Sequence, residues 1–299
     1  MNQQELADYK KAGEIAIKVV AYAKEIIKAN TSLLEIAQKI HKKIEDLNAI
    51  AAFPVNLSID DVAAHYHPVT GDETKATGLL KVDIGVHVNG FVADTAFSID
   101  LTPDNKYKEL IQSSEKALEN SLRLLEKNPD STLNEIGKII QETIEDNGFS
   151  PVVNLSGHGL EQYEIHAEPS IPNYANEDNQ TFKSGAYAIE PFATTGQGKI
   201  YEGPSSNIFA IISEKNTRNP SARKILEYVI KKYKTLPFSL REIQEKFGAM
   251  SRLAIKQMVQ EGILHDFPQL IEKSHKPVSQ TEHTFIKEKN KIIITTRQQ

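Results

Sequence analysis

Apolar residues recur every three or four positions in two long stretches of the chain, at 12–23 and at 110–125. This spacing places the apolar side chains on one face of a helix. A shorter stretch with the same spacing follows each of them, at 31–46 and at 131–146. The pattern therefore predicts four amphipathic helices, arranged as two consecutive pairs.

The two shorter stretches are similar to each other. TSLLEIAQKIHKKIED and STLNEIGKIIQETIED match at seven of sixteen positions without a gap. After each stretch, an extended segment leads to a histidine, His65 in the first case and His158 in the second. Each stretch also begins with a capping-box pair, Ser32 with Glu35 or Thr132 with Glu135. The repeat predicts a pseudo-symmetric α+β domain made of two similar halves.

A β-hairpin is predicted directly after the first histidine. Residues 79–99 are rich in β-forming residues and contain Asn89-Gly90, the strongest short signal for a two-residue turn. The pairing that this turn imposes makes Asp83 and Asp94 diagonal neighbours on one face, about 7–8 Å apart. Two aspartates among apolar residues repel each other, and a cation between them removes the repulsion. The hairpin alone leaves a solvated polar face open as the alternative.

A second pair of acids is expected in the other half of the chain. Glu190 lies inside the apolar strand 186–192, and Glu282 lies near the start of a closing hairpin at 281–294. The second pair is much farther apart in sequence than the first, which predicts an insertion at about 212–273. Three helical patterns fill the insertion, at 219–233, 239–247 and 250–260. The predicted catalytic domain is 1–211 with 274–299, and the helical insertion subdomain is 212–273.

The insertion also has the pattern of a winged helix. Residues 239–265 read as a helix–turn–helix with Gly248 at the turn, followed by a short strand. Lys and Arg are not concentrated on one face, so DNA binding is not expected. We expect this subdomain to serve as a wall of a binding pocket.

Composition excludes several classes of protein. The 299 residues contain 35 Lys and Arg against 40 Asp and Glu, and the net charge of −5 argues against a general nucleic-acid binder. The absence of cysteine excludes disulfides, thiolate zinc sites and a cysteine nucleophile. No apolar run reaches the ~20 residues of a membrane span, and the N-terminus lacks the pattern of a signal peptide. A cytoplasmic protein is expected, with no membrane partner.

Five residues together form a candidate metal site. They are Asp83, Asp94, His158, Glu190 and Glu282. Four carboxylates carry a charge of −4, which two divalent cations would balance. Oxygen-rich ligation with one nitrogen suits Mn, Fe, Co or Zn. Two close metal ions lower the pKa of a water and polarise a carbonyl, which is the chemistry of a hydrolase.

The strings around these residues resemble the pita-bread metallopeptidases of family M24, specifically the type II methionine aminopeptidases of archaeal kind. The strings are AFPVNLSIDDVAAHYHP, KVDIGVHVNGFVADTAFS, NLSGHGLEQYEIHAEPSIPN, YAIEPFAT and QTEHTF. They occur in the order of the family and extend over nearly the whole chain. The resemblance implies a pita-bread fold and removal of the initiator methionine from nascent proteins, with a preference for small second residues.

The resemblance also implies a role for each ligand. Asp83 would chelate one metal ion, and Asp94 and Glu282 would bridge both ions. His158 and Glu190 would complete the second site. Glu190 would also move the proton from the attacking water to the leaving nitrogen.

Two further histidines and an apolar pocket follow from the same resemblance. His65 matches a histidine that contacts the substrate near the leaving group. His166 matches a histidine that stabilises the tetrahedral intermediate. The methionine pocket would consist of Phe53, Ile165, Phe192, Ala254 and Phe267.

Two positions depart from the family pattern. His67 stands where threonine is usual, and Glu168 stands where a small residue is usual. We expect the charge of Glu168 to raise the pKa of His166.

Two alternative functions remain open at this level. A proline-specific aminopeptidase or dipeptidase of the same fold would share the five ligands, although such enzymes often carry an additional N-terminal domain. A non-catalytic relative that binds RNA or protein would have lost ligands, and all five are present. The family expectation is a monomer whose partners are nascent polypeptide N-termini. A ribosome contact fits a co-translational enzyme, although no segment indicates one.

Overall fold

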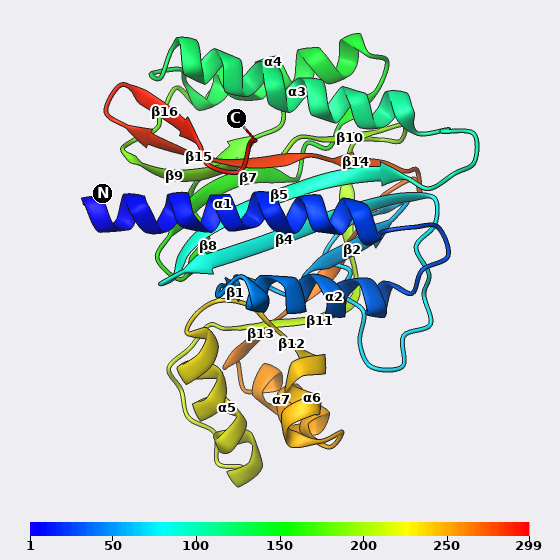
Figure 1. The fold of residues 1–299 in the computed structure, drawn as a ribbon, viewed down its shortest axis with the longest axis vertical. Coiled ribbons are helices and arrows are strands. Elements are labelled where there is room, and N and C mark those ends of the chain that lie inside the picture. Colours follow the sequence, from blue (N-terminus) through cyan, green and yellow to red (C-terminus); the bar gives the residue numbers. More distant parts are fainter. Residues whose placement is uncertain (299) are drawn as a thin grey trace.

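The structure, a computed structural model, describes residues 1–298. A curved nine-stranded sheet lies at its centre, and two pairs of helices pack against it (Figure 1). A third group of helices lies apart from these two pairs, at one end of the molecule (Figure 1). Among the described residues, no helix is both long and apolar enough to cross a membrane.

The N-terminal half consists of two helices and the hairpin that carries Asp83 and Asp94. Asn89 and Gly90 join the two strands of this hairpin, and their φ angles of 54° and 87° suit a type I′ turn. The register makes the two aspartates diagonal neighbours, as the turn predicted. The elements are α1 (Gln3–Ile26), α2 (Leu33–Asp46), β1 (Ile50–Ala51), β2 (Asn56–Ile59), β3 (Val62–Ala64), β4 (Leu79–Val88) and β5 (Phe91–Asp100).

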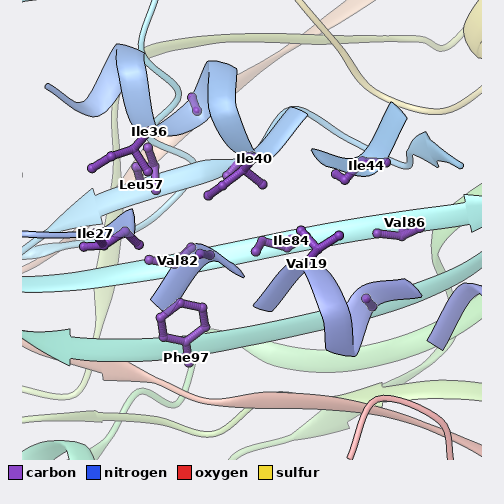
Figure 2. Close-up of a cluster of buried hydrophobic side chains, with 14 of the residues drawn as sticks. Val19, Ile27, Ile36, Ile40, Ile44, Leu57, Val82, Ile84, Val86 and Phe97 are labelled. Atoms are coloured by element: carbon purple, nitrogen blue, oxygen red, sulfur yellow. The ribbon is translucent and has the colours of Figure 1, made fainter. Parts of the chain in front are cut away.

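Alternate residues of β4 face opposite sides of the sheet. Val82 and Ile84 face the helices and pack with Val19 of α1 in a fully buried cluster (Figure 2). Asp83 and Gly85 therefore face the side of the sheet that the helices leave free. The Phe53 ring packs directly on Gly85, where an added Cβ would lie 2.2 Å from Cε1 of that ring. Only glycine leaves room for this contact.

The second half repeats the plan of the first. Its capping box at Thr132 is complete, as predicted, but the one at Ser32 is only half formed, because the Glu35 carboxylate pairs with Lys39 at 2.6 Å instead. The elements are α3 (Lys108–Lys127), α4 (Leu133–Asp146), β6 (Ser150–Pro151), β7 (Ser156–Glu161), β8 (Glu164–Pro172), β9 (Gly185–Ile189), β10 (Phe192–Thr194) and β11 (Ile200–Ile211).

The third group of helices has a hydrophobic cluster of its own. Its elements are α5 (Pro220–Tyr233), β12 (Phe238–Ser239), α6 (Leu240–Phe247), α7 (Ser251–Gln260) and β13 (Leu264–Glu272). All three helices fall within one residue of the predicted bounds. β13 then pairs with β11 and with β3, which connects this group of helices to both halves of the domain.

The C-terminal strands connect the two halves. They are β14 (Val278–Gln280), β15 (Glu282–Glu288) and β16 (Lys291–Ile294). β15 lies between β5 of the first half and β9 of the second, in a sheet with the order β1-β4-β5-β15-β9-β7-β8. The two remaining strands of this sheet pair beside that path, β2 with β4 and β16 with β15. The position of β15 brings Glu282 opposite Ala96 and so beside the hairpin that carries the two aspartates.

Candidate metal centre and active site

The five predicted ligands come from five separate segments and line a single cavity of about 310 Å³. Asp83 lies on β4, Asp94 on β5 and His158 on β7. Glu190 directly follows β9, and Glu282 begins β15. The sheet order therefore collects residues that are up to 199 positions apart in the chain.

The side chains of this cluster meet at short range. Asp94, His158 and Glu282 each offer a ligand atom, and these atoms all lie within 4.8 Å of one another. Nε2 of His158 is 3.8 Å from Oδ2 of Asp94 and 3.8 Å from Oε1 of Glu190. Among residues 1–298, the buried Oδ1 atoms of Asp83 and Asp94 have no hydrogen-bond partner. Buried carboxylate oxygens normally accept a hydrogen bond, so these two oxygens are available to bind a cation. The donor set therefore fits a divalent metal ion.

Burial raises the pKa of each predicted carboxylate ligand, a shift that a bound metal ion would reverse, and it keeps the predicted histidine ligand neutral. It raises the pKa of Asp83 to about 7, and together with repulsion from Asp83 it raises the pKa of Asp94 well above its ordinary value. Burial and the neighbouring carboxylates likewise raise the pKa of Glu190 and Glu282. Burial lowers the pKa of His158 to about 3, so the imidazole is neutral and can act as a metal ligand.

Two amide side chains that the sequence did not point to hold Glu190. Nε2 of Gln280 donates to Oε2 of Glu190 at 3.3 Å, and Nδ2 of Asn173 donates to its backbone oxygen at 3.2 Å. Both amides are buried. The proximity of Gln280 to Glu282 in sequence is the one signal that could have indicated its role.

His65 is held in an uncommon backbone conformation at the cavity wall, with a φ of 64°. Its Nδ1 lies 3.1 Å from the oxygen of Pro268, and burial lowers its pKa to about 4. A neutral ring that donates from Nδ1 to a carbonyl leaves Nε2 as an acceptor. His65 therefore has an acceptor nitrogen, and the residue lines the cavity.

His166 lies on β8 beside the metal centre, with its ring 4.8 Å from that of His158. The ring is reachable by solvent, yet the protein atoms around it lower its pKa by desolvation. The net shift of the His166 pKa is therefore downward, because removal of water from the ring determines its direction. This direction does not test the contribution of the Glu168 charge, which stays a prediction.

Four of the five predicted pocket residues line the cavity. They are Phe53, Ile165, Phe192 and Phe267. Ala254 does not line it, which corrects the prediction. This residue lies on the buried face of α7, in the separate cluster of the helical group. The group contributes Pro237, Phe267 and Leu270 to the cavity instead.

The other histidines near the predicted ligands lie outside the cavity. His67 is buried, and its Nδ1 lies 2.8 Å from the oxygen of Val55. His283 follows Glu282 but faces the opposite side of the strand, where its Nδ1 lies 2.9 Å from Oγ1 of Thr296. Neither His87 nor His275 lines the cavity.

Comparison with known proteins agrees with this site. The model of "Metallopeptidase family M24" matches residues 7–218. The chain belongs to metallopeptidase family M24 and is a metallo-aminopeptidase whose carboxylate–histidine cluster binds divalent metal. Within the family it belongs with the archaeal methionine aminopeptidases. That of Pyrococcus abyssi is 41% identical over 290 residues, 95% of this chain and 97% of the relative. That of Thermococcus onnurineus is 43% identical over 296 residues, 96% of this chain and 97% of the relative.

Solved structures support the fold. The structure of a thermophilic Arx1 matches with a TM-score of 0.84 at 18% identity, covering 99% of this chain and 91% of the other. Methionine aminopeptidase from Rickettsia prowazekii matches with a TM-score of 0.69 at 21% identity, covering 99% and 98%. The pita-bread fold is thereby confirmed.

Proposed function

We propose that this protein removes the initiator methionine from newly made proteins in the cytoplasm, with a preference for small second residues. The observation that carries the proposal is the agreement of two independent features. Relatives at 41% and 43% identity over almost their whole length are methionine aminopeptidases. The five residues that a metal-dependent hydrolase needs also line one cavity.

The site would hold two divalent ions, drawn from Fe, Mn, Co or Zn. Asp83 would bind one ion, Asp94 and Glu282 would bind both, and His158 and Glu190 would complete the second site. Four ionised carboxylates balance two divalent cations in charge, which supports this number. Bound ions would polarise the scissile carbonyl and lower the pKa of water at the site.

Glu190 would transfer the proton during hydrolysis. Gln280 anchors its Oε2, and its Oε1 faces His158. The side chain is reachable from the cavity, so it can take a proton from the attacking water and deliver it to the leaving nitrogen. The amide from Gln280 would keep the carboxylate in one orientation through both transfers.

The histidines and the apolar wall would orient the substrate. His166 would donate to the developing oxyanion, and His65 would accept a hydrogen bond on the leaving-group side. The methionine side chain would fill the apolar region formed by Phe53, Ile165 and Phe267. We propose that the helical insertion, residues 212–273, serves to supply part of this wall.

The test is to strip metal from the protein, restore each divalent ion in turn, and assay Met-Ala-Ser beside Ala-Pro-Ser. Metal-dependent release of methionine, with no cleavage of the proline peptide, supports the proposal. Cleavage of the proline peptide alone would identify a proline-specific enzyme. Failure to bind metal and to cleave either peptide would indicate a non-catalytic binding protein.

A further inference from the structure

Glu168 lies at the open end of the cavity, on an edge strand. β8 pairs only with β7, and the pairing is irregular there. Gly157 pairs with Ile171 and Gly159 with Ala167, so β8 carries two extra residues in this interval. A bulge of this kind redirects side chains beside active sites. Glu168 lines the cavity and is exposed.

The charge of Glu168 has no counter-charge in the structure. Within residues 1–298, its carboxylate forms no hydrogen bond and no ion pair with another side chain. Lys and Arg are absent from the described residues that line the cavity. The four carboxylates at the cavity floor would be balanced by bound metal, but Glu168 is not part of that set. The rim of the loaded site would therefore keep a negative charge.

The position of Glu168 relative to His166 relates this charge to a substrate position. The two residues are two steps apart on β8, which is at most about 6–7 Å, because the irregular pairing can only shorten an extended chain. An extended peptide whose scissile carbonyl lies at His166 advances by about 3.3 Å per residue. The side chain that reaches the level of Glu168 is therefore that of the third substrate residue.

We propose that Glu168 is a specificity-determining residue that favours protein N-termini with a cationic side chain at the third position and disfavours those with an acidic one. This inference rests on the proposed function. Because the pair would be partly exposed to solvent, its effect is modest and sensitive to salt.

The experiment compares three peptides on the metal-loaded enzyme: Met-Ala-Lys-Ser, Met-Ala-Gln-Ser and Met-Ala-Glu-Ser. The expected order of kcat/KM is Lys, then Gln, then Glu, with about a fivefold span between the extremes at low salt. Glu168→Gln should reduce this span to nearly one. High salt should compress the span in the wild type and leave the variant unchanged.

A matched control distinguishes local charge from overall charge. Glu164 is exposed on the same strand but does not line the cavity, so Glu164→Gln should retain the wild-type order. The inference would be overturned, with the proposed function intact, by either of two results. The first is a wild-type enzyme with equal kcat/KM for the three peptides, and the second is a Glu168→Gln variant that keeps the order Lys, Gln, Glu. Absence of cleavage of all three peptides would overturn the proposed function and this inference with it.

Discussion

The hydroxyl of Thr284 holds both backbone polar groups of Asp94. Thr284 Oγ1 accepts from the Asp94 N–H at 2.8 Å and donates to the Asp94 carbonyl at 2.8 Å. β5 and β15 are paired through backbone only at Glu282 and His283, so this side chain continues the connection where the strand ladder stops. The Thr284 N–H in turn donates to Oγ1 of Thr296 at 3.0 Å. A predicted metal ligand is thus oriented by a threonine on β15, the strand that connects the two halves of the domain.

Thr284→Val should weaken metal binding without unfolding the protein. The change keeps the shape of a fully buried side chain but leaves the N–H and carbonyl of Asp94 unpaired. Loss of a residue that orients a metal ligand typically costs about 10- to 100-fold in metal affinity. Isothermal titration of the metal-free protein with Mn²⁺ measures this loss. Thr284→Ser keeps the hydroxyl and should bind nearly as the wild type, whereas equal affinity in all three proteins would refute the role of the hydroxyl.

Glu190→Gln should remove nearly all turnover. The amide cannot accept a proton from water, and loss of a general base typically lowers the rate by about 10²–10⁴-fold. The substitution keeps the volume of the side chain, so the thermal unfolding midpoint should change little. Peptide-cleavage assays measure kcat, and circular dichroism on the same sample measures the thermal unfolding midpoint. Retention of full kcat would exclude Glu190 as the proton carrier.

Metal binding should release protons, and more of them at pH 6.5 than at pH 8.5. Burial raises the pKa of Asp83 to about 7 and also raises the pKa values of Asp94, Glu190 and Glu282, so part of this set carries protons in the metal-free protein near neutral pH. Each proton must leave as metal binds, and therefore the apparent affinity should rise with pH. The pKa of His158 is lowered to about 3, so this ligand contributes no proton. Calorimetry in two buffers of different ionisation enthalpy counts the protons, and a count of zero at pH 6.5 would contradict the expectation.

Phe267→Ala should lower kcat/KM for methionyl peptides by about 10-fold or more. The Phe267 ring lines the cavity and lies 5.7 Å from the ring of His65 and 6.3 Å from that of His166. Truncation therefore removes apolar contact area and loosens two rings that line the cavity. Ala254 is a predicted pocket residue but does not line the cavity, so Ala254→Ser should leave kcat/KM unchanged. Steady-state kinetics on Met-Ala-Ser tests both variants, and an equal loss in both would return Ala254 to the pocket wall.

Much of the site is encoded by local pattern. The apolar spacing defined the four helices of the two halves, and the three helices of the insertion agree with it to within one residue. Asn89-Gly90 defined the hairpin register and thereby the adjacency of Asp83 and Asp94. Periodicity and turn chemistry act over a few residues, so they can be read without any knowledge of tertiary contacts.

The tertiary structure alone decided what depends on sheet order and packing. Glu190 and Glu282 meet the two aspartates only because β15 lies between β5 and β9. The exclusion of Ala254, the amide that Gln280 provides, and the downward pKa shift of His166 all follow from neighbours distant in the chain. The sequence determined the elements and the residue types, because these depend on local periodicity. The fold determined which side chains share the cavity and how far their charges are desolvated, because both depend on contacts between segments far apart in sequence.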